Sequence, residues 1–381
     1  MKMLFASDSF KGSLSAVEIC NLLEQAAETV FPGTETVSVP IADGGEGTVE
    51  ALLRAMGGRW MTTRVADPLF TPVDAKWGML SDGTTAVMEM AQASGLPYVP
   101  QEQRDPRYTT SYGTGEMIAD ALRQGAKKIL IGIGGSATND GGMGMLSALG
   151  AVFTDDKGKQ VSPVGDGLAR VAHADFAHLL PALKECKITV LCDVTNPLLG
   201  PTGATYTYGP QKGGTPAICD ALEAGMTNYA RVIQQVTGKD IDHIPGAGAA
   251  GGLGAAFAGV LGATLKSGID AVLETVDFDQ KLNGVDLVVT GEGRIDGQSV
   301  RFGKVPVGVA RHCAAKNIPV LCIVGGMGEG AEGLFDLCES TIQTTVSDPM
   351  PLEEAMTNAE KLYLDAALRL FRAVRIGMKL R

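Results

Sequence analysis

Several carboxylates of the chain follow short β-rich runs, at points where catalytic acids are often found. Asp8 and Asp43 follow two such runs near the start of the sequence, and Asp193 follows a third in the middle. In open α/β sheets, ligands bind beyond the carboxyl ends of the strands. Phosphoryl transfer uses acids at such places to orient the attacking hydroxyl group and to hold Mg²⁺. Each of these acids could instead cap the N-terminus of a helix.

Three basic residues lie in loops where they could bind an anionic ligand. Arg294, between Glu292 and Asp296, carries the planar guanidinium group that binds a carboxylate through two parallel hydrogen bonds. It could equally form an internal ion pair. Lys11 and Lys212 lie beside glycine and other small residues, where a point charge on a long stem suits a phosphate oxygen. For each lysine, the alternative is a solvated surface side chain.

Glycine makes up 50 of the 381 residues, and the excess gathers in a few loops. The richest loop, Gly132–Gly142, contains G-x-G-x-x-A, with Asp155 and Asp156 about twenty residues further on. This pattern is the dinucleotide-binding fingerprint, so an NAD-dependent oxidoreductase acting on a small hydroxy acid is the alternative function. However, we expect the following helix to begin only near Met143, too late to place its N-terminus under a pyrophosphate. A second match, Gly246–Gly251, follows no clear strand.

Composition and missing motifs exclude several classes of protein. A net charge of −11 argues against binding to nucleic acid or to an anionic membrane. No uncharged apolar run is long enough to span a membrane. The seven cysteines are scattered and the four histidines lie far apart, so we expect reduced thiols and no zinc site. The Walker A motif and the protein-kinase motifs are absent. Because no signal-peptide core precedes Asp8, we expect a cytoplasmic protein.

Short β-rich runs alternate with helical periodicity along most of the chain, which is typical of α/β proteins with parallel sheets. A capping box at Ser15–Glu18 predicts a helix that ends before Pro32, and the apolar spacing after Pro351 predicts one long closing helix. The seven expected strands are Lys2–Ala6, Thr36–Ile41, Lys128–Ile133, Lys187–Cys192, Val285–Thr290, Pro319–Val324 and Thr341–Thr345.

Two domains are expected. The Pro-rich break at Asp67–Val73, followed by a hairpin pattern, indicates the start of a second domain. Plain strand–helix units return after about Asp277. We therefore expect one α/β domain built from both termini, residues 1–65 and 278–381, and an inserted α/β domain, residues 66–277.

The combination of motifs resembles the bacterial glycerate kinase family of the type I, or glycerate 2-kinase, kind. The matching segments cover essentially the whole chain: Asp8–Ala16, Pro40–Thr48, Thr110–Glu116, Gly132–Gly142, Cys192–Leu198, Gly209–Gly213, Pro245–Gly254 and Gly291–Asp296. The chain departs from the family at Gly12, where an acidic residue is frequent. We therefore expect no carboxylate to act at that point.

The resemblance implies ATP-dependent phosphorylation of D-glycerate to 2-phospho-D-glycerate with Mg²⁺, in the breakdown of glycerate, glyoxylate or aldarates. It implies a flavodoxin-like, doubly wound parallel-sheet domain and an inserted α/β domain that resembles restriction endonucleases. The partners that it implies are D-glycerate and ATP, with no nucleic acid and no membrane.

Catalytic and metal-binding roles are predicted from residue type and position. Asp193 is expected to act as the base for the 2-hydroxyl group or to orient it. Lys212 and Lys11 are expected to neutralise the transferred phosphoryl group. Asp43 and Asp8 are expected to hold Mg²⁺.

Binding roles are predicted in the same way. Arg294 is expected to bind the carboxylate of the substrate, with Ser9 and Asn196 as further substrate-binding residues. Small and polar residues of the glycine-rich loops are expected to bind the nucleotide phosphates, partly through backbone amides. These residues are Gly134, Gly135, Ser136, Asn139 and Gly293.

Overall fold

The computed structural model describes residues 1–380, which fold into two compact units of the α/β class. Unit 1 consists of Met1–Asp43, Glu50–Gly57 and the chain from Ile269 onward. Unit 2 consists of Gly44–Val49 and Gly58–Gly268. The prediction of a two-domain α/β fold, with one domain built from both ends of the chain, is confirmed.

Unit 1 is built on a five-stranded parallel sheet with the order β15-β13-β11-β1-β2. In chain order this is the flavodoxin-like arrangement 2-1-3-4-5, as the family resemblance implied. All five strands expected for this sheet are present, with ends displaced by a few residues. They are β1 (Lys2–Ser7), β2 (Glu35–Ser38), β11 (Leu287–Gly291), β13 (Val320–Val324) and β15 (Ser340–Thr344). Two very short strands, β12 (Arg294–Ile295) and β14 (Gly326–Met327), pair with each other.

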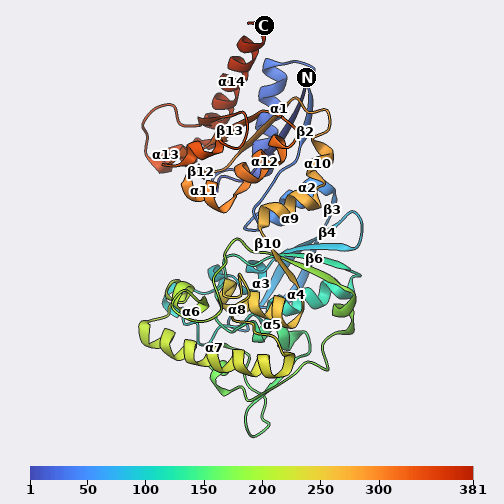
Figure 1. Cartoon of the computed structure of the whole chain (residues 1–381), viewed down its shortest axis with the longest axis vertical. Helices are drawn as coiled ribbons and strands as arrows, with labels where there is room; N and C mark the ends of the chain where they lie inside the picture. The colour runs from blue at the N-terminus through green and yellow to red at the C-terminus, as the bar shows by residue number, and fades with distance from the viewer. Residues whose placement is uncertain (381) are drawn as a thin grey trace. The chain divides into compact units, whose positions relative to one another are not determined.

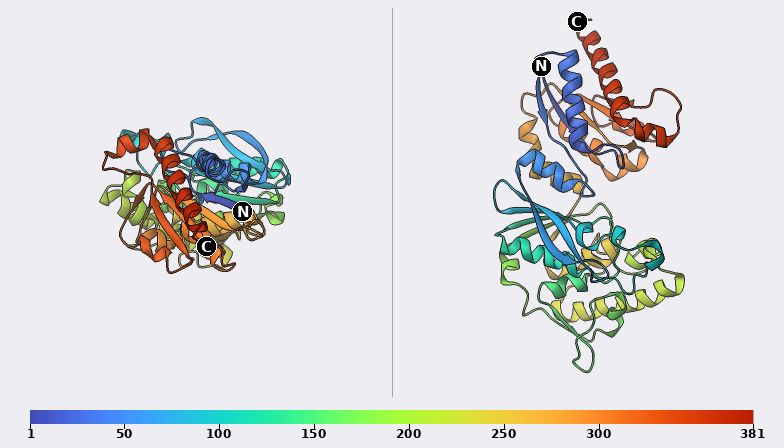
Figure 2. Two further views of the ribbon diagram at one scale, coloured as in Figure 1. Left: turned by 90° about the horizontal axis from the view of Figure 1, so that it is seen from above. Right: turned by 180° about the vertical axis from the view of Figure 1, so that it is seen from behind.

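Helices α1 and α14 lie side by side in unit 1 (Figures 1 and 2) and share a core with one face of its sheet. The capping box of α1 forms as expected: the Glu18 amide donates to Ser15 Oγ, and the Ser15 amide donates to Glu18 Oε2. Phe5 of β1 and Phe371 of α14 stack in this core. The helices are α1 (Ala16–Val30), α2 (Thr48–Met56), α9 (Gly268–Thr275), α10 (Phe278–Lys281), α11 (Gly297–Phe302), α12 (Val305–Ala314), the 3₁₀ helix η7 (Ala331–Leu334), α13 (Leu352–Thr357) and α14 (Ala359–Met378).

The single closing helix that was expected from Pro351 is wrong. Two helices, α13 and α14, meet at Asn358, whose φ of −100° and ψ of 15° are not helical. No residue of α13 is buried, and Leu352 is 75% exposed. The apolar positions of α13 therefore do not continue the core-facing stripe of α14, which begins with Tyr363.

Unit 2 contains a six-stranded mixed sheet with the order β10-β9-β6-β5-β4-β3. The expected hairpin between β4 and β5 is present, but β3 and β10, the two edge strands, were not predicted. The strands are β3 (Gly58–Ala66), β4 (Pro72–Leu80), β5 (Thr85–Glu89), β6 (Lys128–Gly132), β9 (Lys187–Leu191) and β10 (Thr264–Lys266). A separate antiparallel pair is formed by β7 (Val152–Thr154) and β8 (His173–Asp175).

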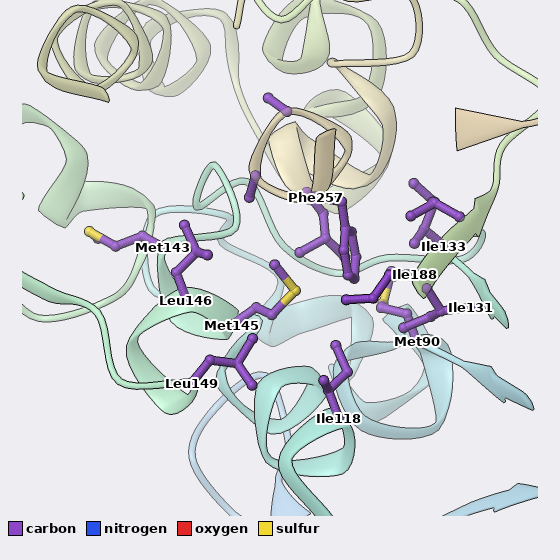
Figure 3. Packing of buried hydrophobic residues seen from close by; sticks show 14 of the residues in the cluster. Met90, Ile118, Ile131, Ile133, Met143, Met145, Leu146, Leu149, Ile188 and Phe257 are labelled. Carbon is purple, nitrogen blue, oxygen red and sulfur yellow. The ribbon is translucent and has the colours of Figure 1, made fainter. Parts of the chain in front are cut away.

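One large core fills unit 2. Figure 3 shows part of it, where Ile118, Ile131, Met145, Ile188 and Phe257 gather from strands and helices far apart in sequence. The α-helices are α3 (Ala91–Ser94), α4 (Tyr112–Arg123), α5 (Met143–Ala148), α6 (Ala204–Tyr208), α7 (Pro216–Thr237) and α8 (Ala249–Ala255). The shorter turns are η1 (Leu96–Tyr98), η2 (Gln101–Gln103), η3 (Gly165–Arg170), η4 (Pro181–Glu185), η5 (Pro210–Lys212) and the π-helical η6 (Ala256–Val260).

Replacing Gly291 with alanine tests the packing at the end of β11. A Cβ atom at Gly291 would lie 1.9 Å from the carbonyl oxygen of Ile323, so the backbone would have to move. We expect Gly291→Ala to lower the free energy of unfolding by about 1–3 kcal/mol in chemical denaturation. Gly326→Ala is the matched control, because a Cβ there meets no atom within 4 Å. Equal stability of the two variants would contradict this packing.

Candidate active site

The first cluster of candidate residues lies in unit 1, at the carboxyl ends of β1 and β11. These strands are neighbours. β2 lies on the other side of β1 and β13 lies on the other side of β11, so the order in which strands are added to the sheet reverses between β1 and β11. Ligands of open α/β sheets bind at such a switch point. Asp8 directly follows β1, and Glu292 directly follows β11. The Asp8 amide donates to the Gly291 carbonyl at 2.9 Å, which holds the two strand ends together.

Asp8 lies in a strongly acidic environment. Its side chain is 7% exposed, and burial raises the pKa of Asp8 to about 7, aided by the charges of Asp43 and Glu292. A hydrogen bond from the Ser9 amide to Asp8 Oδ1, 2.6 Å long, opposes this rise, as does the charge of Lys11. The mutual repulsion of three acids at this edge of the sheet would be relieved by a bound cation.

Glu292 was not predicted as a site residue, although it lies in the motif that contains Arg294. Burial raises the pKa of Glu292 to about 7, while a hydrogen bond from Ser299 and the charge of Lys304 lower it. Its buried Oε1 atom has no hydrogen-bond partner among residues 1–380. A buried carboxylate oxygen without a donor is costly, which makes Glu292 a further candidate for this acidic cluster.

The acids of unit 1 fit Mg²⁺ when phosphate oxygens complete its coordination. Within the described chain, no three His, Cys, Asp or Glu side chains are arranged to hold a metal ion by themselves. Mg²⁺ is usually held by one or two carboxylates together with substrate phosphates. Asp8 and the half-buried Asp43 can supply two carboxylates of this kind.

The loop after β1 and the loop after β11 pack closely. Ser9 Oγ donates to Asp8 Oδ1 at 3.3 Å, and Lys11 is exposed. A Cβ at Gly293 would lie 3.6 Å from Phe10 Cα, so little room separates the two loops. The structure thus brings the predicted residues Ser9, Lys11 and Gly293 together with Asp8.

Arg294 is accessible to a ligand. Its side chain is 71% exposed, and Nε lies 3.8 Å from Asp296 Oδ2. Asp296 itself is engaged as the N-cap of α11, where it accepts hydrogen bonds from the amides of Gln298 and Ser299. An exposed ion pair at this distance contributes little stability. The ion pair with Asp296 is therefore a weak structural reason for an arginine at this position.

The second cluster lies in unit 2, around the glycine-rich loop between β6 and α5. Gly134 and Gly135 are exposed, whereas Ser136 is 7% exposed. The loop is fastened to the segment after α3, because the Leu96 amide donates to the Gly135 carbonyl at 2.8 Å and the Ala137 amide donates to Ser94. The exposed tip of the loop, Gly134 and Gly135, is therefore held in place by backbone hydrogen bonds.

Lys212 lies inside this loop and not on the surface. It is 2% exposed, and Nζ donates to Ser136 Oγ at 2.7 Å and to the Thr138 carbonyl at 2.6 Å. Burial lowers the pKa of Lys212 to about 7, although the charge of Asp140 opposes this change. The alternative of a solvated lysine is wrong here, because the ammonium group is enclosed by the loop that it binds.

Asp140 organises the base of the loop, and the sequence analysis missed it. The carboxylate is fully buried and accepts hydrogen bonds from the amides of Ser111, Gly142 and Gly144 and from Ser111 Oγ. It joins the start of α4 to the start of α5. Burial raises the pKa of Asp140, and these donors lower it. In the sequence, the only indication of this role was the position of Asp140 inside a glycine-rich turn.

Asn139 and Gly251 are buried residues that fix the backbone of the loop and are not accessible to a ligand. Asn139 is fully buried, and its Nδ2 donates to Thr205 Oγ1 at 3.2 Å. Gly251 packs so tightly that a Cβ would lie 2.0 Å from the Thr138 carbonyl oxygen. The second dinucleotide-like match, Gly246–Gly251, is therefore a packing element beneath the loop. The first match is followed by a helix only at Met143, as expected.

Asp193 and Asn196 lie in the loop after β9. Asp193 is exposed, and its Oδ1 accepts a hydrogen bond from the Gly268 amide at 2.8 Å. Asn196 is half-buried, and its Nδ2 donates to the Thr202 carbonyl while its Oδ1 accepts from the Tyr208 hydroxyl group. Asp193 can thus meet a ligand, whereas the amide of Asn196 is occupied within its own loop.

Across residues 1–380, no helix has the length and apolar character needed to cross a membrane.

Comparison with known proteins gives a consistent result over the full length. A family model described as the glycerate kinase family matches residues 3–375. The chain is 45% identical to glycerate kinase of Bacillus subtilis (strain 168), over 97% of this chain and 96% of that protein. It is 45% identical to glycerate 2-kinase of Escherichia coli (strain K12), over 100% of this chain and 99% of that protein.

A solved structure shows the same fold. A crystal structure described as glycerate kinase 2 from Salmonella typhimurium LT2 matches with a TM-score of 0.91 and 42% identity. It covers 100% of this chain and 99% of its own chain. The alternative of an NAD-dependent oxidoreductase finds no support in these comparisons.

Proposed function

The chain belongs to the glycerate kinase family, and we propose that it transfers the γ-phosphoryl group of ATP to the 2-hydroxyl group of D-glycerate. The observation that carries this proposal is the similarity to glycerate 2-kinase of Escherichia coli along the whole chain. We place the reaction in the cytoplasm, in the breakdown of glycerate, glyoxylate or aldarates. Each residue cluster contains charged groups of the kinds that such a transfer uses.

Unit 2 provides the nucleotide phosphates with a preformed backbone surface. Gly134 and Gly135 have no side chains to block a close approach, and both are exposed. Lys212 fixes Ser136 and Thr138 from inside the loop and places a positive charge beneath it. A preorganised positive group needs no reorientation when negative charge moves during the transfer.

Unit 1 contains the acids that would hold Mg²⁺ and the arginine that would bind the small substrate. Mg²⁺, held by Asp8 and Asp43, would neutralise phosphate oxygens. The exposed guanidinium group of Arg294 would bind the glycerate carboxylate through two parallel hydrogen bonds. Ser9 offers a hydroxyl group beside Asp8, and exposed Lys11 adds positive charge in the same loop.

Asp193 is the group that we assign to the attacking hydroxyl. Its bond to the Gly268 amide fixes one oxygen, so the direction of the carboxylate is defined before substrate binds. A carboxylate in this position accepts the hydroxyl proton as the new oxygen–phosphorus bond forms and the bond to ADP breaks.

The proposal is tested by measuring ADP release from ATP with purified protein in a coupled assay. We expect release to require both D-glycerate and added Mg²⁺, and to stop when EDTA removes the metal. ADP release that is independent of glycerate would contradict the proposal. Oxidation of glycerate with NAD, followed by absorbance of the reduced cofactor, would support the oxidoreductase instead.

Replacing Arg294 with alanine tests the carboxylate site. We expect Arg294→Ala to raise KM for D-glycerate by about 10- to 100-fold, because a charged hydrogen bond is lost. The thermal stability should not change, since Arg294 is exposed. Arg301→Ala is the control, because that arginine lies in the nearby α11 and has no assigned role. An unchanged KM for glycerate in Arg294→Ala would remove Arg294 from the substrate site.

A further inference from the structure

The glycine loop needs an accessible cation that Lys212 does not supply. A nucleotide triphosphate carries several negative charges, and this chain has a net charge of −11. The ammonium group of Lys212 is 2% exposed and already donates to Ser136 Oγ and to the Thr138 carbonyl. It stabilises the loop from inside, so a phosphate that lies on the outer side requires a second positive group.

Contacts link Arg104 to the glycine loop on one side and to the residue after Lys212 on the other. On one side, its Nε donates to the Val99 carbonyl at 3.3 Å, the Val99 amide donates to Leu96, and the Leu96 amide donates to the Gly135 carbonyl. On the other side, a Cβ at Gly213 would lie 2.0 Å from the Arg104 carbonyl oxygen. Gly213 directly follows Lys212 and takes φ of +96°, so only glycine allows this approach.

The guanidinium group of Arg104 is held at one end and open at the other. The side chain is partly exposed, and its Nε is fixed by Val99. Among residues 1–380, no carboxylate pairs with Arg104, and its two Nη atoms have no hydrogen-bond partner. A planar group anchored in this way presents two parallel N–H donors, the geometry that fits phosphate oxygens.

We propose that Arg104 binds phosphate oxygens of the nucleotide at the glycine loop. This inference rests on the proposed function, because it requires ATP to bind there. Arg104 binds from the outer side, while Lys212 supports the same loop from within. No motif in the sequence indicated this role, since Arg104 lies in the irregular segment between the 3₁₀ turn η2 and helix α4.

Arg107 is a matched control in the same segment. Its Nε and Nη2 atoms donate to both carboxylate oxygens of Asp105, at distances from 2.6 to 3.1 Å. This pair lowers the pKa of Asp105, first through the hydrogen bonds from Arg107. Because its Nε and Nη2 donors are occupied by Asp105, Arg107 is not available to a phosphate, although it lies only three residues from Arg104.

The experiment measures the binding of ATP and of adenosine to the whole protein by calorimetry, without glycerate. We expect Arg104→Ala to weaken ATP binding by about 10- to 100-fold, with adenosine affinity unchanged. Arg107→Ala should bind both ligands like the wild type. The ATP affinity of Arg104→Lys should lie between those of Arg104→Ala and the wild type, because lysine keeps the charge but lacks the two parallel donors. If Arg104→Ala does not fold, Arg104→Gln provides the test, since its amide can still donate to Val99.

The outcomes separate this inference from the proposed function. Equal ATP affinity of the folded Arg104 variants, Arg107→Ala and the wild type overturns the role of Arg104. An equal loss of affinity for ATP and adenosine also overturns it, because a merely structural role affects both ligands. A wild-type protein that binds ATP but does not phosphorylate glycerate overturns the proposed function, and the Arg104 comparison still decides this inference. A wild-type protein that binds no ATP overturns both.

Discussion

Replacing Lys212 with methionine should lower kcat by roughly 10³, the loss expected when a cation that stabilises a phosphoryl transfer is removed. Methionine fills similar space, but it cannot donate to Ser136 Oγ or to the Thr138 carbonyl. The loop then loses both its internal charge and two hydrogen bonds. Steady-state kinetics with saturating ATP and D-glycerate measure the effect.

The pH dependence of the wild type provides a second readout for Lys212. Burial lowers the pKa of Lys212 to about 7 in the free protein, so its ammonium group loses a proton as pH rises above that value. We therefore expect kcat/KM for ATP to fall on the alkaline side of pH 7, approaching tenfold per pH unit. In Lys212→Met, the residual activity should lack this alkaline fall.

Lys127→Met is the control for Lys212, because Lys127 lies in the same unit but forms an exposed ion pair with Glu185. It should leave kcat and the pH profile unchanged. If Lys212→Met keeps kcat near the wild-type value while its fold is intact, Lys212 has no part in the transfer.

Replacing Asp193 with asparagine should lower kcat by about 10²- to 10⁴-fold, the range for loss of a general base. The amide oxygen of asparagine can still accept the hydrogen bond from the Gly268 amide, so the loop should keep its shape. An amide cannot take a proton from the substrate hydroxyl at neutral pH. The KM values should change far less than kcat, because the carboxylate of glycerate binds elsewhere.

Asp155→Asn is the control for Asp193. Asp155 also accepts backbone hydrogen bonds, from the amides of Lys157 and Lys159, and it is half-buried. It is also one of the two acids that the dinucleotide fingerprint would place on a ribose. We expect Asp155→Asn to keep full activity. If both variants lose activity equally, or if neither does, Asp193 is not the base.

The fold could be predicted largely from local patterns. The inner strands of the parallel sheet, β1, β11 and β13, are continuous apolar runs, and a strand buried on both faces needs such a run wherever it occurs. The α1 capping box is also a local signal, confirmed by Ser15 and Glu18. The edge strand β3 was missed because its residues are mostly exposed, so the alternation that identifies a half-buried strand is weak.

The candidate sites could be predicted only in part, because burial depends on distant segments. Lys212 lies 76 residues from Ser136, and only the fold shows that its ammonium group is enclosed. Asp140 accepts a hydrogen bond from the amide of Ser111, 29 residues away, and no single motif contains both residues. Residue type located Asp8, Asp43 and Arg294, but the buried Glu292 of the same cluster required the packing of unit 1.

The position of the new phosphate ester tests the central claim most directly. Purified protein is incubated with ATP, Mg²⁺ and D-glycerate, and the product is identified by ³¹P NMR against both phosphoglycerate standards. The account predicts 2-phospho-D-glycerate and ADP in equal amounts. A product that is 3-phosphoglycerate, or ATP that stays intact while the protein is folded, would contradict it.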